Sequence, residues 1–126
     1  MKFSLFRAYG AQNSEPVFDA FANSLTSAGH TVIDNTYDCD VGVIWSVLWH
    51  GRMAGNKKVW DDLHALGKKV IVLEVGGIDR GTTWKVAING INRAANFGDT
   101  TEDQTRAKKL GLELKPWKEQ GEYVLI

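Results

Sequence analysis

The most constraining feature of this sequence is a pair of continuous apolar runs separated by one amphipathic segment. The runs are VGVIW at residues 41–45 and VIVLEV at residues 70–75, and each has the length of a strand. Between them, residues 53–66 place Val59 and Leu63 at helical spacing. Strands that are apolar on both faces are typical of parallel sheets covered by helices. The stretch therefore predicts a βαβ unit.

The preceding residues extend this unit into one α/β domain over residues 1–126. Ser14 and Glu15 are suited to begin a helix, and Gly29 is suited to end it. We expect a three-layer, Rossmann-like or flavodoxin-like domain with helices on both faces of the sheet. Its mainly parallel sheet should consist of strands at residues 3–8, 31–33, 41–45 and 70–74.

The residues after the second apolar run allow two interpretations. Trp84, Val86 and Ile88 alternate with other residues, and Asn89-Gly90 supplies a two-residue turn that needs positive φ. This pattern favours a β-hairpin. The same stretch, residues 84–95, also places apolar residues at helical spacing, so a helix is the alternative.

The end of the chain adds a short helix and an apolar run. A capping box at residues 101–104 predicts a short, exposed helix that ends before Gly111. Residues 122–126 predict a final strand. Domain ends are usually polar, so two alternatives follow. Either Ile126 closes an edge of the sheet, or the chain is the front part of a longer two-domain protein.

The composition excludes several classes of protein. Fifteen basic and fifteen acidic side chains balance, so we expect no sequence-independent binding of nucleic acid. No stretch reaches the roughly 18 apolar residues of a membrane span. The single Cys39 fits a reducing compartment, and we expect a cytoplasmic protein. The histidines lack the paired spacing of a zinc helix, and no phosphate-binding loop is visible, so neither a metal nor a cofactor is expected.

The carboxyl ends of parallel strands meet at one edge of a sheet, and ligands bind there. The loops at residues 9–13, 46–52 and 76–80 should share this edge. Tryptophan offers a stacking surface, arginine suits a phosphate or carboxylate, and glycine permits close approach. The alternative is that the tryptophan packs internally and the glycines form turns. The candidate ligand-binding residues are Tyr9, Gly10, Trp49, His50, Arg52, Glu74, Gly76, Gly77 and Arg80.

Glu74 is an acid inside an apolar run, where it requires a partner. We expect its carboxylate to bond to Arg80, to Arg93 or to backbone amides. An ion pair would be a purely structural role. No catalytic residue is assigned from the sequence.

Several motifs together suggest a family. They are WHGRM at residues 49–53, GKKVIVLEVGG at 67–77, RGTTWKV at 80–86, INGINR at 88–93, and LGL, KPW and GEYVLI at 110–112, 115–117 and 121–126. From about Asp40 onward the chain resembles the front half of bacteriophage-encoded glycosyltransferase-like proteins.

This resemblance implies the two-domain GT-B arrangement, in which two Rossmann-like domains face a cleft. The nucleotide-sugar donor would be held mainly by a second transferase domain. The chain would then be the acceptor-side domain, located in the host cytoplasm, which binds a sugar- or nucleotide-like ligand and does not catalyse transfer alone.

Two other functions stay open. One is a non-catalytic interaction or ligand-binding module of flavodoxin-like shape. The other is an enzyme that resembles nucleoside deoxyribosyltransferases, which use a glutamate nucleophile on the helix before the Gly-Lys step. Here that helix offers only Asp61 and Asp62.

Overall fold

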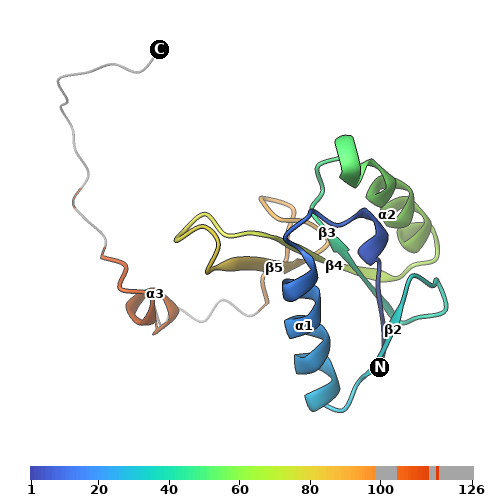
Figure 1. Ribbon diagram of the computed structural model, residues 1–126, viewed down its shortest axis with the longest axis horizontal. Helices are drawn as coiled ribbons and strands as arrows, with labels where there is room; N and C mark the ends of the chain where they lie inside the picture. The colour runs from blue at the N-terminus through green and yellow to red at the C-terminus, as the bar shows by residue number, and fades with distance from the viewer. Residues whose placement is uncertain (99–104, 114–115, 117–126) are drawn as a thin grey trace.

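The fold is organised around a five-stranded sheet with the strand order β2-β1-β3-β4-β5 (Figure 1). The computed structural model describes residues 1–98, 105–113 and 116. The first four strands pair in parallel, and β5 pairs antiparallel with β4. The predicted α/β fold with a mainly parallel sheet is confirmed. The strands are β1 (Lys2–Leu5), β2 (Thr31–Asp34), β3 (Val41–Trp45), β4 (Lys69–Val75) and β5 (Trp84–Ile88).

The helices fall close to their predicted positions. Ser14 precedes the first of them, but its hydroxyl donates to the Ala11 carbonyl at 2.8 Å and makes no cap bond to the helix. The central helix begins at Gly55 because the four residues before it form a 3-10 turn. The helices are α1 (Glu15–Ser27), α2 (Gly55–Ala65) and α3 (Thr105–Lys109), with 3-10 turns η1 (Arg7–Tyr9) and η2 (Gly51–Ala54).

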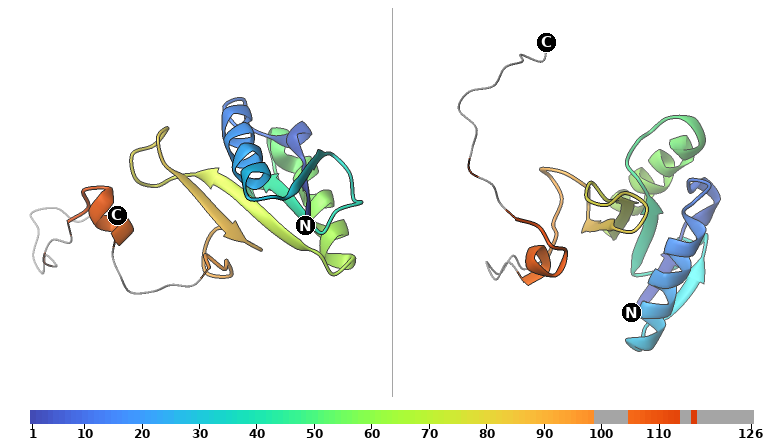
Figure 2. Two further views of the ribbon diagram at one scale, coloured as in Figure 1. Left: turned by 90° about the horizontal axis from the view of Figure 1, so that it is seen from below. Right: turned by 60° about the vertical axis from the view of Figure 1, so that its left-hand side comes forward.

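The helices α1 and α2 lie on opposite faces of the sheet (Figure 2). Alternate residues of β3 therefore enter two separate cores. Val43 and Trp45 pack on the α1 side, whereas Ile44 packs on the α2 side. A Cβ added at Gly42 would lie 2.2 Å from Leu63 of α2. The glycine thus permits α2 to approach the sheet closely.

The first strand is shorter than expected, ending at Leu5 instead of residue 8. The Arg7 guanidinium bonds to three carboxylates outside the strand, those of Glu15, Asp19 and Asp34, at 2.8–3.1 Å. Those three groups belong to α1 and to the end of β2. At the end of the strand, the Phe6 amide still donates to the Val43 carbonyl at 2.9 Å, and the Leu5 carbonyl accepts from the Asn35 amide at 3.0 Å.

The strand predicted at residues 84–88 is confirmed, and the helical alternative is wrong. This strand, β5, forms a hairpin with β4 through residues 76–83. Asn89 has φ 56° as expected, and its Oδ1 accepts from the Val70 amide at 3.0 Å. The hairpin predicted after β5 is reduced to one bridge, between Ile88 and Asn96. Its connection spans residues 89–95 because Asn89 turns back to bond with β4.

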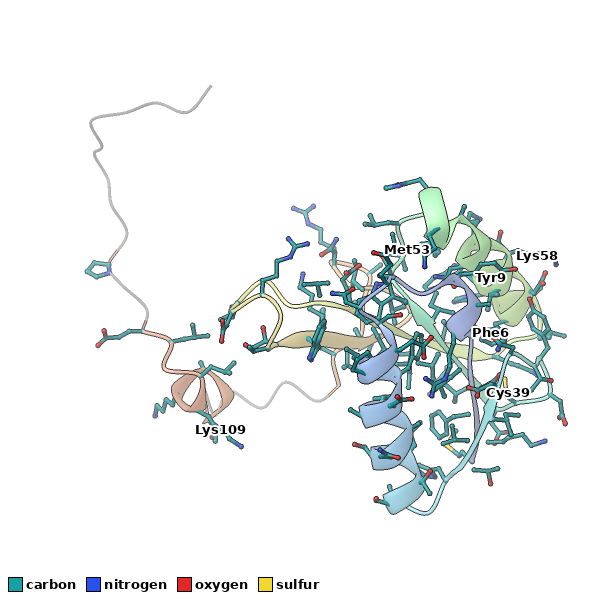
Figure 3. All side chains as sticks on the ribbon, viewed as in Figure 1. Phe6, Tyr9, Cys39, Met53, Lys58 and Lys109 are labelled. Carbon is teal, nitrogen blue, oxygen red and sulfur yellow. The ribbon has the colours of Figure 1, made fainter. Side chains whose placement is uncertain are left out.

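The chain leaves β1 toward β2 and later crosses to β3 on the other side of β1. The loops after β1 and β3 diverge at this switch point, where α/β sheets commonly bind ligands. Here, however, Asn56 of α2 fills the gap. Its Nδ2 donates to the Trp45 carbonyl at 2.6 Å and to the Tyr9 carbonyl at 3.2 Å. Figure 3 shows Tyr9 and Met53 at this end of the molecule.

The connection between β2 and β3 is anchored on the α2 side by Tyr37. Its ring lies 5.3 Å from that of Phe6, and its backbone carbonyl accepts a bond from Lys68. Burial, together with a hydrogen bond to the Asp62 carboxylate, raises the pKa of the Tyr37 phenol to about 12. The protonated phenol is therefore the form that the folded state favours.

Two predicted features lie outside the described residues. They are the capping box at residues 101–104 and the final strand at residues 122–126. The helix expected after the capping box is observed as α3, over Thr105–Lys109.

The pKa of Tyr37 predicts a pH dependence of stability. Between about pH 10 and pH 12 the unfolded state has lost the phenol proton and the folded state has kept it, so stability falls as pH rises through this window. In Tyr37→Phe this decline should be shallower. Urea unfolding at several pH values between 9 and about 12 would measure it. Equal slopes for the two proteins would contradict the prediction.

The position of Asn56 predicts a large cost for a nearly isosteric change. Asn56 is fully buried, and Asn56→Asp would replace its two donated bonds with a carboxylate that faces two carbonyls. We expect the free energy of unfolding to fall by at least about 1–3 kcal/mol. Asn92→Asp, at an exposed position, should change it by less than about 0.5 kcal/mol. Urea unfolding followed by circular dichroism compares the two variants. Equal losses of stability would argue against a stabilising role for the two hydrogen bonds that Asn56 donates.

Candidate functional site

A pocket of about 290 Å³ opens at the carboxyl edge of the sheet, beside the ends of β3 and β4. Of the candidate ligand-binding residues, it brings together Glu74 and Arg80. We call it the edge pocket. It is lined by Ala11, Asn13, Trp45, Leu48, Met53, Glu74, Val75, Arg80 and Gly81.

The lining of the edge pocket combines an apolar floor with three polar groups. Trp45 is buried and Met53 is half-buried, and both belong to the core on the α1 side. Three of the residues that line it have polar side chains, Glu74, Arg80 and Asn13. This arrangement can accept hydroxyl groups, bind an anionic group and cover an apolar ring face.

The Glu74 carboxylate is held by the backbone. Its Oε1 accepts from the Val75 amide at 2.7 Å, which confirms the backbone partner among the expected ones. Within the described residues it makes no ion pair with Arg80 or Arg93. Its antiparallel neighbour on β5 is Lys85. Glu74 is half-buried and lines the edge pocket near the end of β4.

Arg80 lies on the hairpin between β4 and β5. The ends of this loop are joined where the Gly76 amide donates to the Thr83 carbonyl at 2.9 Å. Within the loop, the Thr82 hydroxyl bonds to the Asp79 carboxylate, and the Thr83 hydroxyl donates to the Ile78 carbonyl. Arg80 itself is exposed and has no ion-pair partner among the described residues. Its guanidinium is therefore available to an anion.

Four of the candidate residues have packing roles or lie in open space. The Tyr9 ring covers Gly55, where an added Cβ would lie 2.3 Å from it. A Cβ at Gly10 would lie 2.2 Å from the Ser14 hydroxyl, and one at Gly76 would lie 2.4 Å from the Thr83 carbonyl. These two glycines permit close packing of the protein against itself. Gly77 faces open space.

The remaining candidates lie around η2. His50 and Arg52 are exposed, and Arg52 has no ion pair among the described residues. Neither lines the edge pocket. Trp49 turns to the α2 side of the sheet, where it lines a second pocket of about 330 Å³. We call this the side pocket. It is lined by Val47, Trp49, Trp60, residues 89–92 and Ala94.

The turn that separates the two pockets begins at Ser46. This buried serine has φ 65°, which is uncommon for a residue other than glycine. Its amide donates to the Leu73 carbonyl at 2.8 Å, and its Oγ accepts from the Leu48 amide at 3.1 Å. These bonds direct Leu48 to the edge pocket and the chain beyond it to the side pocket.

The edge pocket also has lining residues that were not among the candidates. Asn13 and Leu48 lie in the loops predicted for this edge, although neither was chosen as a candidate. Trp45 and Val75 are the last residues of β3 and β4. Their position at strand ends was the signal that could have identified them.

The aspartates of α2 have partners on its exposed side. Asp61 bonds to Lys57, and Asp62 bonds to Lys58, each at 2.6 Å. These carboxylates do not line either pocket.

In the described part of the chain, no three His, Cys, Asp or Glu side chains are grouped so that they could hold a metal ion. Among the same residues, no helix is long and apolar enough to cross a membrane. Comparisons with protein-family models, with curated proteins and with solved structures found no significant match to this chain. What the chain binds must therefore be inferred from the chemistry of its pockets.

Proposed function

We propose that this chain binds a sugar- or nucleotide-like small molecule in the edge pocket. The observation that carries this proposal is the position of the pocket, at the carboxyl edge of β3 and β4 and beside the switch point of the sheet. Glu74, Arg80 and Asn13 line the pocket together with apolar residues. Ligand pockets typically combine a few polar groups with apolar walls in this way.

Each group in the edge pocket has a role in this proposal. Glu74 has one oxygen bonded to the Val75 amide, and the other accepts a bond from a ligand hydroxyl. The Asn13 carboxamide supplies a further donor and acceptor. Arg80 binds a phosphate or carboxylate of the ligand. Met53 and Leu48 cover its ring.

The glycosyltransferase resemblance supports the same class of ligand. We propose that the chain acts as an acceptor-side domain of the GT-B type and binds its ligand without transferring a sugar by itself. In that family the donor is held mainly by a second domain.

A second candidate is a non-catalytic interaction or ligand-binding module of flavodoxin-like shape. The strand order β2-β1-β3-β4-β5 favours it, because this order is that of flavodoxin-like sheets. Fold alone does not specify function. Selective binding of nucleotide sugars or glycans in the edge pocket would favour the first candidate over the second.

A titration of the full chain tests the proposal. Nucleoside diphosphate sugars, monosaccharides and oligosaccharides would be added while backbone amide shifts are followed by NMR. We expect shifts to cluster at Asn13, Leu48, Glu74 and Gly81. Shifts confined to the opposite edge of the sheet, or none at all, would refute the site. Turnover of a sugar donor by this chain would refute binding without transfer.

Two variants test the roles proposed for Arg80 and Glu74 in ligand binding. Arg80→Ala should weaken binding of a phosphate-bearing ligand by at least about tenfold, or about 1.4 kcal/mol, because it removes the cation. Glu74→Gln should weaken binding of the sugar portion. Arg93→Ala removes an exposed arginine outside the edge pocket and should leave both affinities unchanged. Isothermal calorimetry measures all three, and equal losses in Arg80→Ala and Arg93→Ala would contradict the assignment.

A further inference from the structure

The side pocket lies on the α2 face of the sheet, apart from the edge pocket. It is bounded by the connection from β3 to α2, by α2 itself and by the connection that follows β5. The last of these segments is far from the other two in the sequence. No lining residue is shared with the edge pocket, so its ligand chemistry can be considered separately.

Two indole rings form one wall of the side pocket. The centroids of Trp49 and Trp60 are 5.7 Å apart, and the ring planes are inclined by 56°. Both side chains are half-buried. The ring of His64 lies 4.3 Å from that of Trp60, and its Nδ1 is 2.8 Å from the Trp60 carbonyl. Trp60 is thus supported from its own helix, while the pocket stays open in front of it.

Carboxamides form the opposite side. Asn89 is bonded through its Oδ1 to the Val70 amide, which fixes its side chain and leaves the NH₂ group as a donor. Asn92 is exposed, and its carboxamide has no hydrogen-bond partner among the described residues. Of the described residues that line the pocket, none carries a charge. The pocket therefore offers hydrogen bonds and apolar surface but no attraction for a phosphate.

We propose that the side pocket binds a neutral saccharide. A pyranose ring presents C–H groups on its faces and hydroxyls at its rim, which match indole surfaces and carboxamides respectively. The two indoles contact each other at 5.7 Å and together form one apolar wall, against which the C–H face of a sugar ring can pack. The volume of about 330 Å³ lies at the lower end of the range for ligand pockets, which suits one or two sugar units.

This inference goes beyond the proposed function and does not depend on it. The edge pocket depends on Arg80 and Glu74, and the side pocket depends on Trp49 and Asn92. A failure of one assignment leaves the other intact, because different residues report on each.

Titration of the full chain with neutral disaccharides tests the proposal. The probes are maltose, cellobiose and lactose, followed through tryptophan fluorescence and the indole N–H signals of Trp49 and Trp60 in NMR spectra. We expect saturable binding of at least one probe with shifts of both indole signals. Absence of binding by all three would overturn the proposal, as would binding that shifts only edge-pocket residues.

Variants locate the bound sugar. Trp49→Ala should weaken binding of that disaccharide by at least about tenfold, and Trp49→Phe should retain most of it, because an aromatic face remains. Asn92→Ala should weaken it several-fold. Because Asn92 is exposed, this variant should fold normally, so a loss of binding in it would not be due to misfolding. Lys108→Ala changes an exposed residue outside both pockets and is the control that should have no effect. Unchanged affinity in Trp49→Ala and Asn92→Ala would overturn the site.

Adenosine and uridine provide the test of ligand class. We expect neither to shift the two indole signals. If either nucleoside binds more tightly than the disaccharides and this binding is lost in Trp49→Ala, the pocket is a base-binding site and the saccharide assignment is wrong.

Discussion

The burial of β3 on both faces is the constraint on which the rest of the structure depends. Every residue of this strand is buried, so each face of the sheet must be covered by a helix. Gly42 then allows α2 to come within contact of β3 through Leu63. Parallel pairing with β1 and β4 follows, and it directs the loops after all three strands to one edge, where the edge pocket opens.

Packing at the switch point determines where that pocket lies. In an open doubly wound sheet the crevice between the two diverging loops is the usual ligand site. Here the buried Asn56 donates to the carbonyls of Trp45 and Tyr9, one on each side of the crevice. The Tyr9 ring packs over Gly55. The crevice is thus filled by protein, and the accessible space moves toward β4 and its hairpin. Arg80 and Glu74 are the charged residues that line this accessible space.

The two pockets differ in electrostatics, and this difference separates the ligands we propose for them. The lining of the edge pocket includes one acidic and one basic residue, which suit the ligand with hydroxyl and anionic groups that we propose. The described residues of the side pocket are uncharged and include two indoles, which suit a neutral ring. Ser46 divides them, because its positive φ turns the chain between Trp45, which faces the first pocket, and Trp49, which faces the second.

The sequence by itself determined the parallel sheet, the two covering helices and the edge at which the loops meet. These follow from local periodicity and from chain direction, both of which are readable along the sequence. Only the tertiary structure decided where the loop side chains point. Trp49 packs beside Trp60 and residues 89–92, and the two glycines at positions 10 and 76 are required by close packing against Ser14 and Thr83. For Trp49 above all, the partners are distant in sequence, so no local pattern specifies the contact.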